Sequence, residues 1–290
     1  DRAMAPLVLR GLPRTIALLL PIPAVLLSLP SWIERISAAR FPTHQSGIVV
    51  ISGASTGIGR HAALTLDKSG YAVLAGVRKA ADAAALREES STLRPVILDV
   101  TDPKSIAAAA EAATALAREM GLPIIALINN AGVSGRAPLE VQDLGTLRAM
   151  YEVNVFGVVA LTQALLPALR ASQGRIVNVG SLAGLIATPG SGAYSGTKAA
   201  LEATTDALRL ELLPQGVSVS LVEPGYVRTA IAQKQMRGAT TEQEAADRWG
   251  LAGALARIYG PMLATADARR QAVEAKADSP VVTSAAIAHA

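Results

Sequence analysis

Residues 48–59 read Ile-Val-Val-Ile-Ser-Gly-Ala-Ser-Thr-Gly-Ile-Gly, and this stretch decides the fold. The run 48–51 is apolar and β-branched, as in a buried strand, and a helical pattern follows the last glycine to Ser69. Between them, the spacing Gly-x-x-x-Gly-x-Gly permits a tight turn and close approach of the backbone to a pyrophosphate. Free amides at the start of the helix would meet the negative charge. The stretch therefore predicts a strand, a glycine turn and a helix that bind a dinucleotide.

Outward from this unit, the chain alternates short β-branched runs with helical patterns. Such βαβ alternation predicts a single-domain α/β fold of Rossmann type over residues 47–290, a doubly wound parallel sheet with right-handed crossovers. Asp102 is expected to cap an Ala-rich helix that runs to about Met120. The further strands are predicted at 71–77, 94–99, 124–128, 175–179 and 217–222.

The composition excludes several classes of function. With 290 residues, 51% of them apolar, the chain can bury a large core. It has no cysteine, which excludes disulfides, thiolate metal sites and cysteine nucleophiles, and no metal site is predicted. The net charge of +4 lies mostly in residues 1–46, which hold five arginines and two acidic residues. With aromatic residues at only 3%, this distribution argues against a nucleic-acid partner.

The end of the second predicted strand bears on the choice of cofactor. An acidic residue there would hydrogen-bond a ribose 2′-hydroxyl, whereas this chain has Arg78 and Lys79. The planar guanidinium of Arg78 can bind a 2′-phosphate through two parallel hydrogen bonds. The sequence therefore predicts NADP(H), with NAD(H) as the alternative.

Residues 193–198 read Ala-Tyr-Ser-Gly-Thr-Lys and open an apolar-periodic segment that continues to about Leu213. Positions four apart share one face of a helix, so the Tyr194 hydroxyl and the Lys198 ammonium can share one site. A fixed cation favours the phenolate and lowers a phenol pKa that is ordinarily about 10. We therefore expect Tyr194 to give and take protons. For a motif this short, a surface pair without function is the alternative.

Taken together, these motifs resemble the short-chain dehydrogenase/reductase family in its oxidoreductase branch, and in particular its membrane-anchored retinol- and hydroxysteroid-dehydrogenase-like members. The resemblance spans residues 47–290. It implies an enzyme that transfers a hydride between NADP(H) and a carbonyl or secondary alcohol, with a lipophilic substrate. The catalytic residues that it implies are Asn154, Ser181, Tyr194 and Lys198.

The resemblance also implies where the cofactor is held. Asp99 and Val100 would meet the adenine, Val227 the nicotinamide carboxamide, and Thr229 would lie near the phosphates. The segment 230–278 would cover the substrate. A last helix is predicted from about Ser279, and the seventh edge strand of the family is missing, so that either the sequence is incomplete or the sheet has six strands. The expected cofactor contacts are Gly53, Ser55, Thr56, Gly57, Ile58, Gly59, Arg78, Asp99, Val100, Asn130, Ala131, Gly132, Tyr194, Lys198, Pro224, Gly225, Val227 and Thr229.

Residues 1–46 are predicted to be a hydrophobic anchor or targeting segment with a connector. The uncharged run 15–29 would span about 22 Å as a helix, less than the roughly 30 Å of a bilayer core, and its prolines would bend it. Extension to residues 7–29 reaches spanning length. We expect association with the endoplasmic reticulum or another organelle membrane, in an orientation that flanking charges on both sides leave open.

Two other functions stay open at this point. The apolar arm could attach the chain to a partner, which would make it a non-catalytic structural subunit of a membrane complex. The complete catalytic set weighs against this alternative. An epimerase or dehydratase is disfavoured by the glycine spacing. A homodimer is the other association that the family resemblance implies.

Overall fold

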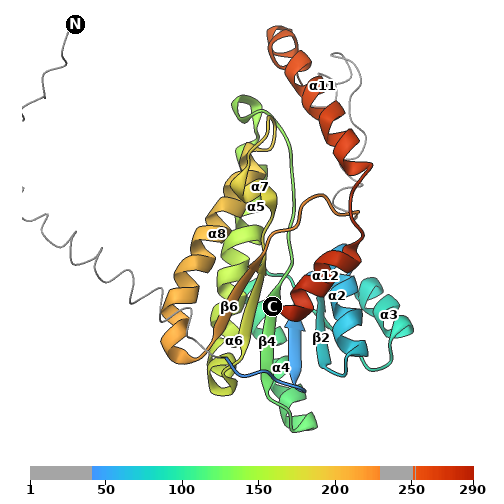
Figure 1. The fold of residues 1–290 in the computed structure, drawn as a ribbon, viewed down its shortest axis with the longest axis vertical. Helices are drawn as coiled ribbons and strands as arrows, with labels where there is room; N and C mark the ends of the chain where they lie inside the picture. Colours follow the sequence, from blue (N-terminus) through green and yellow to red (C-terminus); the bar gives the residue numbers. More distant parts are fainter. Residues whose placement is uncertain (1–40, 229–250, 252) are drawn as a thin grey trace, which may run out of the picture. The chain divides into compact units, whose positions relative to one another are not determined.

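Six parallel strands form one sheet in the order β3-β2-β1-β4-β5-β6 (Figure 1). The structure is a computed structural model that describes residues 41–228, 251 and 253–290. The central strand β1 is flanked by β2 and β4, so the chain winds outward first in one direction and then in the other. The strands are β1 (Ile48–Ile51), β2 (Ala72–Val77), β3 (Arg94–Ile97), β4 (Ile124–Asn129), β5 (Arg175–Val179) and β6 (Ser218–Val222).

The helices connect these strands and extend beyond β6. Short 3-10 turns lie at Leu139–Val141 (η2) and Leu213–Gln215 (η4), and a π-helical segment η3 (Glu152–Phe156) joins two helices. The α-helices are α2 (Gly57–Lys68), α3 (Ala80–Glu89), α4 (Pro103–Met120), α5 (Leu144–Tyr151), α6 (Gly157–Ser172), α7 (Leu182–Leu185), α8 (Gly192–Leu212), α11 (Ala254–Glu274) and α12 (Pro280–His289).

Strand β1 shows why the sheet needs helices on both faces. All four of its residues are buried, and alternate side chains of a strand point to opposite faces. Ile48 and Val50 pack into a core with residues of α4 and α6, while Val49 and Ile51 pack into a second core with residues of α2 and α3. The apolar run at the start of the glycine stretch therefore lies at the centre of two hydrophobic cores.

The predicted Rossmann-type sheet is confirmed, and most boundaries agree with the sequence pattern. Strands β1 and β5 have the predicted limits, and Asp102 caps α4 by accepting a hydrogen bond from the Lys104 amide at 2.9 Å. The third strand ends two residues before the predicted Asp99, because the chain turns there around the Asp99 carboxylate. The long helix predicted after Leu144 is interrupted by the π-helical segment around Asn154.

Within the described residues, the segment Leu144–Ser172 is the one helix long and apolar enough to cross a membrane. Of the 18-residue stretch of this helix that is apolar enough to cross a membrane, 44% is buried inside the protein. Leu161, Leu165 and Leu169 are among the largest fully buried or nearly buried side chains of the core. Its apolar character is therefore explained by packing on the sheet.

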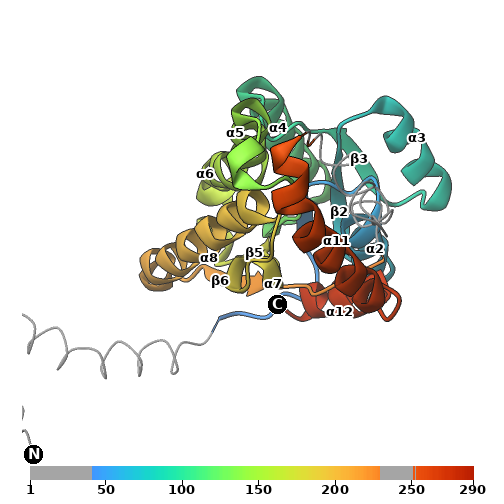
Figure 2. The same ribbon diagram turned by 90° about the horizontal axis from the view of Figure 1, so that it is seen from above.

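The two C-terminal helices, α11 and α12, occupy different places in the fold. A parallel bridge pairs Val227 with Asp278, on either side of α11, and α12 then packs against α2. Seen from above, α11 lies over the end of the sheet at which the parallel strands finish (Figure 2). From Phe41 to Ala290 the chain forms one compact unit. The predicted anchor, up to residue 40, and much of the predicted segment 230–278 lie outside the described residues.

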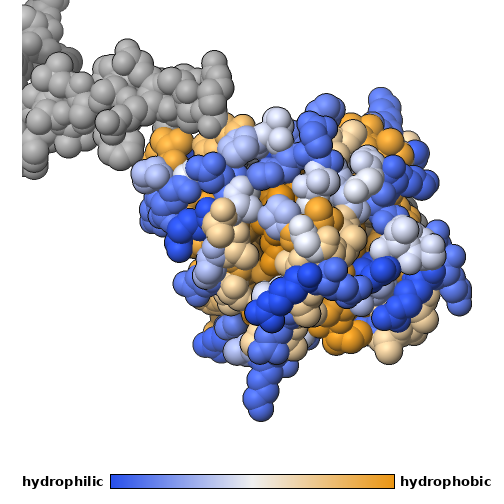
Figure 3. Space-filling view, turned by 90° about the horizontal axis from the view of Figure 1, so that it is seen from below, coloured by the Kyte–Doolittle hydropathy of each residue, from blue (hydrophilic) through white to orange (hydrophobic). Residues whose placement is uncertain are grey.

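Apolar side chains are exposed on more than one face of this unit. The face seen from below in Figure 3 shows apolar side chains as separate patches among hydrophilic ones. Exposed large apolar residues also follow the carboxyl ends of the strands, in η2, in and after α7, and on α11: Leu139, Leu182, Leu185, Ile186, Ile258 and Met262. The loops at that end are therefore the place to look for a site for apolar ligands.

Candidate active site

The sequence-predicted site residues come together along one edge of the sheet. Because all six strands are parallel, their carboxyl ends lie at the same edge. The glycine turn follows β1, Arg78 follows β2, and Asn130 follows β4. Ser181 comes two residues after β5, and Pro224 two residues after β6. Residues spread over more than 170 positions of sequence thus lie at one edge of the sheet.

The glycine turn after β1 forms a cradle of backbone. Gly53 and Gly57 have φ angles of +69° and +59°, which side-chain-bearing residues rarely adopt. A Cβ atom on Gly59 would lie 2.2 Å from the Asn130 amide nitrogen and 2.4 Å from the Gly53 carbonyl oxygen. In the described residues, no side chain caps the first amides of α2, and no acidic residue occupies its first turn. These amides can therefore bind the pyrophosphate of a dinucleotide.

Asn130 fixes the cradle to the neighbouring strand. Its side-chain amide donates to the carbonyl oxygens of Ser52 and Gly53 at 3.0 and 2.9 Å. In the opposite direction, the Ser52 hydroxyl accepts from the backbone amides of Asn130 and Ala131, both at 3.1 Å. The turn after β1 and the turn after β4 are therefore held together by four hydrogen bonds, which explains the position of the Asn-Ala-Gly motif.

Tyr194 lies in the first turn of α8 and faces Ser181. The Ser181 hydroxyl lies close enough to the phenol to influence its pKa, and it accepts a hydrogen bond from the Ala183 amide at 3.1 Å, which fixes the start of α7. Burial raises the pKa of Tyr194 above its ordinary value, and the neighbouring Ser181 hydroxyl acts against this rise. A ligand oxygen that meets both hydroxyls would receive two hydrogen bonds.

Lys198 is held by the end of β5. Its side chain is only 6% exposed, and Nζ donates to the Val179 carbonyl oxygen at 2.8 Å. Burial of the ammonium lowers the pKa of Lys198 to about 8. A Cβ built on Gly132 would stand 3.9 Å from Nζ, so the amine reaches the turn after β4 as well.

Asn154 connects that turn to the helix that carries Tyr194 and Lys198. The residue is fully buried in the π-helical segment. Its side chain accepts from the Val133 amide and donates to the Val133 carbonyl, both at 2.9 Å, and it donates to the Thr197 hydroxyl at 3.0 Å. Thr197 in turn donates to the Tyr194 carbonyl at 2.7 Å. The sequence motif contains Thr197, but nothing in its spacing indicated this contact.

The structure differs from the prediction that Lys198 makes the phenol more acidic. Nζ lies 5.9 Å from the centre of the Tyr194 ring, and its hydrogen bond goes to a backbone carbonyl. At this separation the desolvation of the phenol has the larger effect, so the pKa of Tyr194 rises. Helical spacing placed the two residues on one face, but it did not determine the distance between the charged atom and the hydroxyl.

The remaining predicted cofactor contacts lie along the same edge. Hydrogen bonds from the Thr101 backbone amide and hydroxyl hold the pKa of Asp99 below its ordinary value, and the nearby Arg78 guanidinium adds to this effect. Arg78 itself is exposed at the end of β2. Val100 and Val227 are buried, whereas Thr229 lies outside the described residues.

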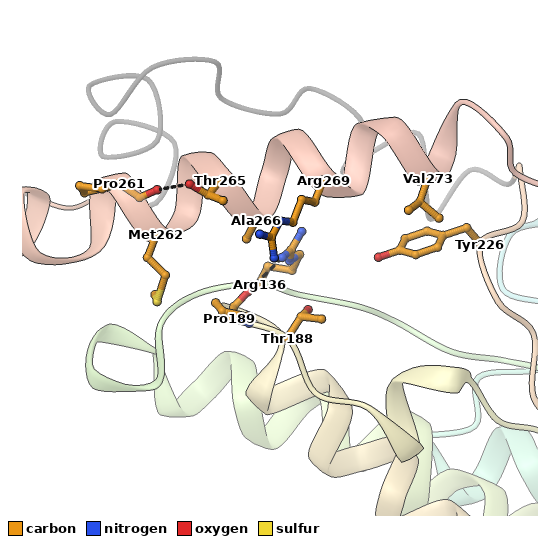
Figure 4. A pocket seen from close by; sticks show the side chains of 10 residues that line it. All are labelled: Arg136, Thr188, Pro189, Tyr226, Pro261, Met262, Thr265, Ala266, Arg269 and Val273. Atoms are coloured by element: carbon orange, nitrogen blue, oxygen red, sulfur yellow. Dashed lines mark hydrogen bonds between the residues drawn. The ribbon is translucent and has the colours of Figure 1, made fainter.

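A cavity of about 570 Å³ borders this site beneath α11 (Figure 4). Its lining includes Thr188 and Pro189, from the loop between Ser181 and Tyr194. Arg136 joins three parts of its wall, because it pairs with Asp267 of α11 at 3.3 Å and donates to the Pro189 carbonyl at 3.0 Å. Sequence reasoning missed this ion pair, because no local pattern links residues 131 positions apart.

Comparison with known proteins agrees with this geometry. Residues 47–239 match the family model described as short chain dehydrogenase. The chain is 43% identical over 182 residues to the uncharacterized oxidoreductase YbbO of Escherichia coli K12, covering 62% of this chain and 66% of that protein. It is 42% identical over 215 residues to bovine 17-beta-hydroxysteroid dehydrogenase type 6, covering 73% of this chain and 67% of that enzyme.

Among solved structures, the sheet and its helices are similar to a short-chain dehydrogenase from Streptomyces avermitilis. The two share 34% sequence identity with a TM-score of 0.59, over 64% of this chain and 68% of the other. The chain thus spans about two thirds of the length of the proteins that it matches.

The depressed pKa of Lys198 predicts how stability depends on pH. Between pH 8 and about 10.5 the unfolded chain binds the Lys198 proton and the folded chain does not, so the free energy of unfolding rises with pH in this window. Relative to a Lys198→Met variant, the wild-type free energy of unfolding should increase by about 2 kcal/mol between about pH 7.5 and 9.5, measured by urea denaturation. Parallel pH curves for the two proteins would contradict burial of a charged amine.

Proposed function

Since the chain belongs to the short-chain dehydrogenase family, we propose that it is an oxidoreductase that transfers a hydride between NADP(H) and a lipophilic carbonyl or secondary alcohol. The observation that carries the proposal is the pair of neighbouring hydroxyls of Ser181 and Tyr194, which lies beside the buried Lys198 amine and at the edge that holds the glycine cradle. The apolar residues along the adjoining cavity support a lipophilic substrate.

In this proposal, Tyr194 and Ser181 act on the substrate oxygen. In reduction, the Tyr194 phenol gives its proton to the oxygen as the carbonyl carbon accepts the hydride, and it takes the proton back in oxidation. Ser181 donates a hydrogen bond to the same oxygen, where negative charge develops in the transition state. The raised pKa of Tyr194 keeps the phenol protonated at neutral pH, as a proton donor requires.

Lys198 and Asn154 support these two groups. With a pKa of about 8, the Lys198 amine can exchange a proton close to neutral pH, and so can return a proton towards Tyr194. Asn154 is a positioning residue, because its hydrogen bonds with Val133 and Thr197 fix the turn after β4 against α8. When bound, NADP(H) supplies or accepts the hydride.

The cradle fits the pyrophosphate of the cofactor, and Arg78 favours NADP(H) over NAD(H). Backbone amides at the start of α2 would hold the pyrophosphate, since the three glycines leave no Cβ in the way. The exposed Arg78 can form a bidentate contact with a 2′-phosphate. It already lies close enough to Asp99, the predicted adenine contact, to lower the pKa of that carboxyl.

The first test is Tyr194→Phe. Loss of the proton donor should lower kcat for carbonyl reduction by about 100- to 10,000-fold, while NADPH affinity, measured by fluorescence titration, changes by less than about twofold. The matched control is Tyr71→Phe, because the Tyr71 hydroxyl bonds the His44 carbonyl away from the site. Near wild-type turnover in Tyr194→Phe would refute the role of Tyr194. Failure of the wild type to bind NADPH or reduce any carbonyl of a broad panel would favour the non-catalytic subunit instead.

A second test addresses the cofactor. Arg78→Ala removes a charge-assisted contact, so KM for NADPH should rise about 10- to 100-fold while KM for NADH stays within about twofold. Arg87→Ala, which removes an exposed arginine of α3, is the control and should affect neither value. An equal rise in KM for NADPH and for NADH would show that Arg78 does not bind the 2′-phosphate.

The proposal includes membrane association through residues 7–29, which rests on the sequence alone. A Leu18→Asp/Leu19→Asp variant should place two charges in the apolar run and reduce flotation of the full chain with phospholipid vesicles by at least about tenfold. Purified oligomers should be compared by light scattering, because loss of flotation through aggregation would be a different result. Equal flotation of variant and wild type would remove this part of the proposal.

A further inference from the structure

The cavity beneath α11 combines an apolar wall with cationic groups. Its apolar lining comes from α11 and from the loop before α8, and includes Pro189, Pro261, Met262, Ala266 and Val273. Two arginines, Arg136 and Arg269, also line it, and within the described part of the chain no carboxylate does. Its volume of about 570 Å³ lies in the usual range for sites that bind small molecules.

The two arginines differ in their surroundings. Arg136 is only 8% exposed and forms an ion pair with Asp267, which is 1% exposed, so its charge is offset. Arg269 lies on the same helix as Asp267, two residues after it and three residues after the lining residue Ala266, and is exposed to solvent. It forms neither a hydrogen bond nor an ion pair with any residue that the structure describes. Figure 4 shows its side chain extending from α11 towards the loops that carry Arg136 and Thr188.

We propose that Arg269 binds a carboxylate-like anionic group of an amphipathic substrate, whose apolar body occupies the cavity beneath α11. An anion loses hydration when it enters an apolar cavity, and a forked guanidinium is the group that compensates for this loss best. Arg269 can bind the anion without breaking the contacts of the cavity wall, because Arg136 is the arginine that bonds Asp267 and the Pro189 carbonyl. This inference rests on the proposed function in calling the ligand a substrate.

The cavity wall is joined to the catalytic groups. The Thr188 amide and hydroxyl donate to the Ser191 hydroxyl at 2.9 and 3.1 Å, and Ser191 directly precedes α8, the helix of Tyr194. On the other side, the Leu182 amide donates to the Pro224 carbonyl at 3.1 Å, two residues before the lining residue Tyr226. The wall of the cavity is therefore continuous with the segments that carry Ser181 and Tyr194.

The test measures binding and does not require turnover. Dodecanoate and its methyl ester are titrated into the full-length protein by calorimetry, below the concentration at which either aggregates. Dodecanoate should bind the wild type at least about tenfold more tightly than the ester. Arg269→Met should weaken dodecanoate binding about 10- to 100-fold and leave the ester unchanged, and Arg269→Lys should retain part of the preference.

The matched control is Arg257→Met, because Arg257 is an exposed arginine of the same helix that does not line the cavity. Wild-type affinity in this variant would support a local contact at Arg269. The proposal is overturned if dodecanoate does not bind, if acid and ester bind equally, or if Arg257→Met has the same effect as Arg269→Met.

A parallel assay with oxo-dodecanoate and NADPH separates this inference from the proposed function. Anion-selective binding that depends on Arg269, without reduction of any carbonyl compound, would support the anion site and refute hydride transfer. Reduction of neutral carbonyls alone, with equal binding of acid and ester, would support the enzyme and overturn the anion site.

Discussion

A hydrogen bond from the buried Lys198 ammonium to the Val179 carbonyl ties helix α8 to the end of strand β5. It satisfies a charge that burial would otherwise leave without a partner, and it fixes the position of α8 along the sheet. Because Ser181 follows Val179 by two residues and Tyr194 precedes Lys198 by one helical turn, the same contact sets the Ser181 hydroxyl opposite the phenol. The proposed chemistry therefore depends on a structural bond between a side chain and a strand carbonyl.

Similar contacts between side chains and backbone hold the whole carboxyl edge of the sheet. Asn130 hydrogen-bonds the backbone of the glycine turn after β1, and Asn154 hydrogen-bonds the backbone of the turn after β4. Each side chain thereby joins its own segment to another one. Deeper in the sheet, Asn129 donates to Asn178, and Asn178 donates to Thr205 of α8, both at 2.9 Å. Buried polar groups that are paired in this way rigidify their neighbours, so the site has fixed walls before any ligand binds.

The substrate side is built differently from the cofactor side. The cofactor cradle consists of short-range turns that follow the central strands, whereas the cavity depends on α11, which is anchored through Arg136 and Asp267 and through a hydrogen bond from Tyr259 to Glu140. A fold with a common cofactor half and a separately anchored covering helix can keep one reaction and change its substrate. In the proposed function, the sheet edge therefore serves the cofactor and α11 serves the choice of substrate.

The sequence by itself determined the parallel sheet, the glycine turn and the order of the site residues, because these follow from local periodicity and from steric demands within a few residues. The limits of β1 and β5 and the Asp102 cap are examples. Only the tertiary structure decided the direction of the Tyr194 pKa, the hydrogen-bond partner of Lys198, the π-helical turn at Asn154 and the pairing of Arg136 with Asp267. Each of these depends on the packing of segments far apart in the chain, where burial and atomic distance, rather than spacing along the chain, set the electrostatic energy.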